Sequence, residues 1–198
     1  MKHLTLSRAL LGLLTLGYLI GAAVYFSSIG NAEFMGYIAG VATLLLLVGL
    51  TLPWTRIPDW LLWMLSFLML LHILGGGVKV AGDVLYAYVV FPLENPTGLT
   101  FLKFDQLVHA YGAGVAAFFG YFFLGRLGAR AGWGMGVGAF LIAMGCGALN
   151  EIVELVATLL SPESGVGGYF NNAIDLVANA GGAALAALLA VRYWKKPA

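Results

Sequence analysis

The residues best suited to chemistry in this sequence are acidic, amide and histidine side chains at helical spacing inside apolar segments. Asp105 and His109 lie four residues apart in the run FDQLVHAYG. Glu151 and Glu154 lie three residues apart in the run LNEIVEL. Residues spaced by three or four lie on one face of a helix. Carboxylates beside a histidine are the groups that general acid–base catalysis and metal-assisted hydrolysis require.

A third set of polar residues begins a later apolar segment. The run NNAIDLVANAGGA places Asn171, Asp175 and Asn179 at intervals of four, which makes one stripe along a helix face. We expect Asp175 to act with the first two pairs. Other polar residues in or beside the apolar segments are assigned supporting roles: Asn150, Asn171, Asn172, Asn179 and His72.

These polar residues lie in a chain whose composition is that of a membrane protein. Of its 198 residues, 61% are hydrophobic and 10% are charged, and the mean hydropathy is +0.93. An average soluble domain carries about 25% charged residues. The sequence therefore predicts an all-α integral membrane protein, one polytopic domain with about six spans of roughly 20 residues. The apolar segments are Ala9–Ser28, Phe34–Trp54, Trp60–Leu74, Phe104–Leu124, Trp133–Leu160 and Phe170–Tyr193.

The first apolar segment has the outline of a signal peptide, because Lys2 and Arg8 precede an apolar run from Ala9 to Phe26. The apolar core of a signal peptide is about 7–15 residues long. This run is longer and matches a membrane span. We therefore expect a retained first helix that also directs insertion.

The third segment and the long connection after it are irregular. The glycines at 75–77 are expected to break the third helix after Leu74. The stretch Val84–Phe91, with sequence VLYAYVVF, is too apolar for a solvated loop. Its tyrosines suit the headgroup region, so we interpret it as an interfacial or re-entrant segment. A seventh span is the alternative, but the stretch is too short to cross a bilayer.

The basic residues predict the orientation. Six spans with a cytoplasmic amino terminus place eight of the ten basic residues inside, and only Lys79 and Lys103 outside. This asymmetry predicts that both termini lie in the cytoplasm. The eight inner residues are Lys2, Arg8, Arg56, Arg126, Arg130, Arg192, Lys195 and Lys196.

That orientation brings the polar sets to one depth near the outer, periplasmic face. A helix rises about 1.5 Å per residue, so Asp105, His109, Glu154 and Asp175 are expected at similar levels. Ionisable residues in a span are costly unless they face the bundle interior. The alternative is that they hold the helices together by hydrogen bonds. So many carboxylates with a histidine favour a functional site.

Small residues recur within the spans at intervals of four. Such spacing lets helix backbones approach closely in lipid. We therefore assign these glycines to packing, because no phosphate-binding motif surrounds them. The sets are Gly134 with Gly138, Gly112 with Ala116, and Gly182 with Ala186 and Ala190.

A resemblance to known proteins follows the same residues. The chain resembles, over about residues 71–185, the small bacterial inner-membrane family typified by YjdF. The resemblance lies in four runs, which occur in the same order: LHILGGG, FDQLVHAYG, LNEIVEL and NNAIDLVANAGGA. They are similar, more distantly, to the VanZ-like group, which is linked to glycopeptide resistance and the cell envelope. The resemblance implies a common polar core at residues 71–185. In the family pattern an arginine and an aromatic residue stand where this chain has Gln106 and Leu155.

Three functions fit these observations. The first is a membrane enzyme, a metal-dependent hydrolase or transferase that acts on a lipid or a lipid-linked cell-envelope substrate. The second is a proton- or cation-coupled transporter, and the third is a non-catalytic lipid-binding or assembly protein. Membrane lipids are expected partners. Nucleic acid is not, because no basic patch lies beyond the flanks that topology explains. The sequence does not determine the oligomeric state.

The charge of the polar set suggests a cofactor. Four carboxylates would share a space of low dielectric with only Lys79 and Lys103 on that side. Two negative charges then remain. Two protons can neutralise them, since like-charged carboxylates disfavour ionisation of one another. One divalent metal ion can also do so, and zinc or manganese suits mixed nitrogen and oxygen donors. The predicted ligands are Asp105, His109, Glu151, Glu154 and Asp175, of which all but Asp175 are also candidate catalytic residues.

Overall fold

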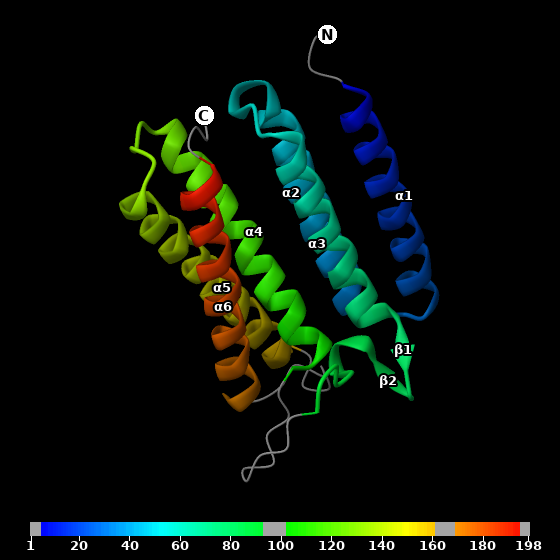
Figure 1. Cartoon of the computed structure of the whole chain (residues 1–198). Coiled ribbons are helices and arrows are strands. Elements are labelled where there is room, and N and C mark those ends of the chain that lie inside the picture. Colours follow the sequence, from blue (N-terminus) through cyan, green and yellow to red (C-terminus); the bar gives the residue numbers. More distant parts are fainter. Residues whose placement is uncertain (1–4, 93–101, 161–168, 195–198) are drawn as a thin grey trace. The chain divides into compact units, whose positions relative to one another are not determined.

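Six long α-helices dominate the computed structural model, which describes residues 5–92, 102–160 and 169–194 (Figure 1). All six are long and apolar enough to cross a membrane. The prediction of six spans is therefore confirmed for the described residues. The helices are α1 (Leu6–Ser28), α2 (Ala32–Thr55), α3 (Asp59–Gly77), α4 (Phe104–Arg126), α5 (Trp133–Leu160) and α6 (Tyr169–Tyr193).

The chain forms two compact units, residues 1–84 and residues 85–198. The first unit contains α1, α2 and α3, and the second contains α4, α5 and α6. Each unit has its own buried apolar clusters. That the two units act as a single membrane domain stays a prediction.

In the first unit, α1 packs against both α2 and α3. Leu19, Ala22 and Phe26 of α1 form a buried cluster with Ile38 of α2. At the amino-terminal end of α1, Arg8 Nε lies 2.7 Å from Asp59 Oδ1. These contacts fix α1 against both of its neighbours.

Helix α3 continues through the glycines at 75–77, so the predicted break after Leu74 is wrong. Gly77 lies against an aromatic ring, because a Cβ at this position would be 3.1 Å from Phe26 Cζ. At Gly76 a Cβ would overlap the ring of Phe34. The absence of side chains at Gly76 and Gly77 thus leaves room for two aromatic rings. An unbroken helix also keeps its backbone groups hydrogen-bonded, as a lipid environment requires.

After α3 the first unit ends in a short antiparallel hairpin of β1 (Lys79–Val80) and β2 (Asp83–Val84). Ala81 and Gly82, between the strands, both have positive φ angles, of 54° and 95°. Two such residues form the turn that matches the twist of a two-residue hairpin.

The second unit begins with the apolar stretch that was expected at the membrane interface. Residues Leu85–Ala87 form a 3-10 turn, η1, that contacts α4. The backbone N–H of Phe104 donates to Tyr88 O at 2.8 Å, and Val90 N donates to Leu102 O at 2.9 Å. Residues 84–91 contain no spanning helix, and the depth of this stretch stays a prediction.

Helices α4, α5 and α6 form a bundle in which each packs against the other two (Figure 1). Their central contact is a cluster of small buried residues, which allows close approach. At Gly182 an added Cβ would collide with Ala110 O, so α4 and α6 meet backbone to backbone. At Gly134, in contrast, an added Cβ would meet nothing within 4 Å among the described residues, so its packing role stays a prediction. The cluster consists of Ala113, Ala117, Ala143, Ala183 and Ala186.

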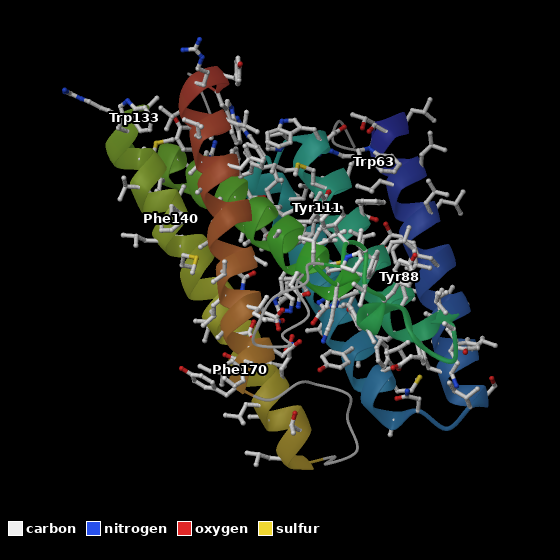
Figure 2. All side chains as sticks on the ribbon, turned by 60° about the horizontal axis from the view of Figure 1, so that its bottom comes forward. Trp63, Tyr88, Tyr111, Trp133, Phe140 and Phe170 are labelled. Carbon is white, nitrogen blue, oxygen red and sulfur yellow. The ribbon has the colours of Figure 1, made fainter. Side chains whose placement is uncertain are left out.

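The two ends of this bundle differ in character. Figure 2 shows Trp133 and Phe170 at opposite ends. At the Trp133 end, Tyr121, Met135 and Ala139 are buried together, and Trp194 packs against this cluster. The Phe170 end carries the histidine and carboxylate side chains His109, Glu151, Glu154 and Asp175. Large apolar residues elsewhere on the bundle are exposed, as expected for surfaces that contact lipid tails.

Candidate metal centre

Three helix segments meet at the polar end of the second unit. The beginning of α4, the last turns of α5 and the beginning of α6 lie together in Figure 1. Gln106 Oε1 accepts a hydrogen bond from the backbone N–H of Lys103 at 2.7 Å, which satisfies one free donor at the start of α4. The predicted coincidence of the three polar sets is thus present in the structure.

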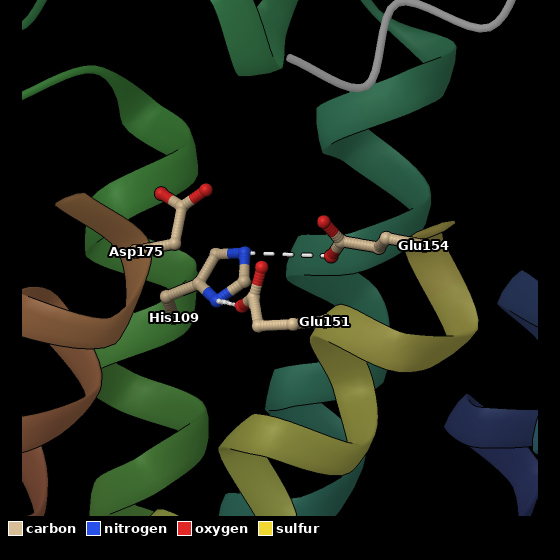
Figure 3. A group of neighbouring side chains, drawn as sticks. All are labelled: His109, Glu151, Glu154 and Asp175. Atoms are coloured by element: carbon tan, nitrogen blue, oxygen red, sulfur yellow. Dashed lines mark ion pairs between the residues drawn. The ribbon is translucent and has the colours of Figure 1, made fainter. Parts of the chain in front are cut away.

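His109 lies at the centre of this end, with a carboxylate on each side of its ring (Figure 3). Its Nδ1 is 3.3 Å from Glu151 Oε1, and its Nε2 is 3.5 Å from Glu154 Oε1. Asp105 Oδ1 lies 3.6 Å from the same Nε2. The imidazole therefore connects α4 to both glutamates of α5.

Four residues present donor atoms to one point. One ligand atom each from His109, Glu151, Glu154 and Asp175 lies within 4.8 Å of the other three. Glu154 is partly exposed and the other three residues are buried. A nitrogen and three carboxylate oxygens at this separation can hold a divalent ion.

Glu151 is the least satisfied member of the group. It is 6% exposed, and neither of its carboxylate oxygens has a hydrogen-bond partner within the described residues. Its contact with His109 is short enough for an ion pair but is not aligned as a hydrogen bond. A buried charge needs a partner or a metal ion, so this carboxylate is placed to receive a cation. Glu154, in contrast, accepts from Asn150 Nδ2 at 2.6 Å.

Asp175 is held by two amide groups. Gln106 Nε2 donates to its Oδ1 at 2.7 Å, and Asn171 Nδ2 donates to its Oδ2 at 2.5 Å. Gln106 is buried and was not among the predicted site residues. Its spacing of three from His109 places it on the same helix face, which is the signal that could have identified it.

Asp105 lies at the edge of the group and outside the four converging donors. Asn171 Nδ2 is 3.5 Å from its Oδ2, and Lys103 Nζ is 3.5 Å from Asn171 Oδ1. In the described part of the chain, Lys103 forms no ion pair with a carboxylate. Lys79 belongs to the other unit. Within the described residues of the second unit, Lys103 is the basic residue that lies beside this acidic group.

The remaining predicted residues are less closely involved. Asn179 is buried one turn beyond Asp175, whereas Asn172 is only partly buried. His72 lies in α3 of the first unit, and its participation stays a prediction. The catalytic and ligand roles of the whole set also stay predictions.

Fold and site together define a multi-pass α-helical membrane protein with a buried histidine–carboxylate group in its second unit. The chain belongs to the family described as predicted membrane protein (DUF2238), which matches residues 8–196. The match includes the first two spans, which the sequence resemblance at residues 71–185 left out. No curated protein and no solved structure matches the chain.

Proposed function

We propose that the protein binds a divalent metal ion, zinc or manganese, through His109, Glu151, Glu154 and Asp175. The observation that carries this proposal is the convergence of four donor atoms on a buried carboxylate without a hydrogen-bond partner in the described chain. Groups that merely held the helices together would be expected to satisfy one another. Zinc and manganese both accept imidazole nitrogen with carboxylate oxygen.

The surrounding amides support a built site. Gln106 and Asn171 fix Asp175, and Asn150 fixes Glu154. Residues that hold a metal ligand by hydrogen bonds orient it and strengthen metal binding. Asn171 also lies 3.5 Å from Asp105, which gives that carboxylate a supporting role.

We propose further that the site serves hydrolysis or transfer on a lipid or lipid-linked substrate of the cell envelope. A bound divalent ion would activate water or polarise the substrate. His109 and Glu151, 3.3 Å apart, are the candidate acid and base. The exposed apolar faces of the bundle would admit a substrate from the bilayer, and Lys103 stands beside the group to contact an anionic headgroup.

The location belongs to the same proposal. The basic residues favour the inner membrane with both termini in the cytoplasm, which would place the polar end of the bundle at the periplasmic face. The resemblance of this region to YjdF and, more distantly, to VanZ-like proteins supports a role at the envelope.

A reconstituted assay tests the enzymatic part. Purified protein in vesicles made from bacterial inner-membrane lipids, loaded with zinc or manganese, should convert a lipid into a new species seen by mass spectrometry. Chelation and His109→Ala should each abolish the conversion. If no lipid changes although the metal is bound, the enzymatic part of the proposal is wrong.

A proton-coupled transporter is the second candidate. It is favoured by one observation, which is that both nitrogens of His109 face carboxylates on other turns. Such a chain of titratable groups can relay protons. Vesicles with an internal pH dye distinguish this function. If the protein is a transporter, wild-type protein should change the internal pH, and the His109→Ala variant should not.

A further inference from the structure

Asn179 carries a buried hydrogen-bond donor that the proposed metal ion cannot satisfy. The residue is 2% exposed, and its Nδ2 has no hydrogen-bond partner among the residues that the structure describes. An amide nitrogen donates and does not ligate a cation. Buried polar groups almost always have a partner, which is either protein or ordered water.

The amide lies next to the metal centre. A Cβ added at Gly147 would be 2.7 Å from Asn179 Nδ2, so the amide group fills the place of a side chain on α5. Gly147 precedes Glu151 by four residues, which is one turn on the same face. Side chains on a helix lean toward its amino terminus, so that of Glu151 leans toward Gly147. The unpartnered donor of Asn179 and the carboxylate of Glu151 therefore lie against the same face of α5, within one turn of each other.

We propose that Asn179 and Glu151 together hold a buried water molecule on the inner side of the metal centre. Water is the smallest molecule that accepts from the amide and donates to a carboxylate at once. Neither carboxylate oxygen of Glu151 has a hydrogen-bond partner in the described chain, so one oxygen can face the metal ion and the other can accept from the water. The place of this water in catalysis rests on the proposed function, whereas its presence is tested separately.

The arrangement assigns different tasks to the two side chains. The N–H of Asn179 donates to the water oxygen, and one water proton points to the Glu151 carboxylate. A lone pair of the water is then directed away from both side chains, and Glu151 is placed to accept the proton that points to it. Asn179 is thus a water-positioning residue, and Gly147 leaves the space that its amide occupies.

An experimental map of the metal-free wild-type protein that shows ordered water tests this inference. We expect a solvent peak within hydrogen-bond distance of both Asn179 Nδ2 and a Glu151 carboxylate oxygen. A direct protein partner for the amide, or a dry contact, would overturn the inference. A solvent peak in a protein that binds no metal would support the buried water and refute the metal centre. Metal binding by a protein that shows no such peak would support the metal centre and refute the buried water.

Two variants test the same point independently. Asn179→Leu removes the donor at similar volume, and Gly147→Ala displaces the amide while Asn179 is kept. Both should lose the solvent peak, whereas the Mn²⁺ dissociation constant should change by about tenfold or less, because no ligand is removed. Val177→Leu, at an exposed position of the same helix, is the control and should keep the peak. A peak that persists in both test variants would contradict the assignment.

Discussion

His109 Nδ1 of α4 lies 3.3 Å from Glu151 Oε1 of α5. This contact joins the two helices through the least satisfied carboxylate of the group. Both side chains are buried. Replacing either one therefore removes the charged neighbour of the other in a medium of low dielectric. The consequences differ between a metal ligand and a residue that only holds helices together.

Glu151→Gln should separate these two roles. If Glu151 is a ligand, the substitution should leave the metal-free protein as stable as wild type or more so, because it removes a buried charge whose oxygens have no hydrogen-bond partner in the described chain. Metal at about 100 times its dissociation constant should stabilise wild type by about 2.7 kcal/mol. The variant should lose most of that gain in thermal unfolding with and without Zn²⁺ or Mn²⁺.

The control for this comparison is Asp83→Asn, which changes an exposed carboxylate of the hairpin. It should retain the full gain. If Glu151→Gln destabilises the metal-free protein and leaves the metal effect unchanged, Glu151 has a structural role only.

Gln106→Leu should weaken both the helix start and the metal centre. The variant loses the donor to Asp175 and the acceptor for Lys103 N–H. We expect about 1–3 kcal/mol of destabilisation from the groups left unpaired and a metal affinity about 10–100-fold lower. Unfolding curves and titration with a competing metal dye measure the two effects.

Exposed Leu107 on the neighbouring position provides the comparison. Leu107→Ala should leave the metal affinity unchanged. Equal affinity in Gln106→Leu and wild type would show that Asp175 does not depend on its amide partner.

Gly182→Ala should disrupt the contact between α4 and α6, because its Cβ would collide with the Ala110 carbonyl oxygen. Overpacking of this kind costs about 1–3 kcal/mol, which thermal unfolding in detergent would measure. Gly181→Ala is the matched control, since a Cβ there meets nothing within 4 Å. Equal melting temperatures for the two variants would refute the close approach.

Reporter fusions test the predicted topology. A fusion at the carboxyl terminus should report the cytoplasm, and one in the loop at residues 162–169 should report the periplasm, because eight of ten basic residues favour that orientation. The loop lies mostly outside the described residues. Reports from the same side would refute the topology and with it the periplasmic site.

Much of the fold and of the candidate site follows from the sequence because membrane helices carry strong local signals. The segment Trp133–Leu160 was predicted with the bounds of α5. Helical spacing put Asp105 with His109 and Glu151 with Glu154 on common helix faces, and the cost of ionisable groups in lipid predicted that these faces turn toward the bundle interior. Helical spacing concerns a single helix, and the cost of ionisable groups depends on the surrounding lipid. Neither rule requires knowledge of the contacts between helices.

The features that could not be predicted depend on contacts between helices. Spacing places Gln106 on the His109 face of α4, but its partner Asp175, 2.7 Å from its amide, comes from α6. The ring of Phe26, against which Gly77 of α3 packs, lies on α1. Neither neighbour is visible in the local sequence pattern.

The metal content of the purified protein tests the central claim most directly. Protein isolated in detergent without chelator should contain about one zinc or manganese ion per chain by elemental analysis, and the ion should stabilise it. His109→Ala, prepared in the same way, should contain almost none. Wild-type protein that is free of metal as isolated, and that keeps full thermal stability after added chelator, would contradict the account.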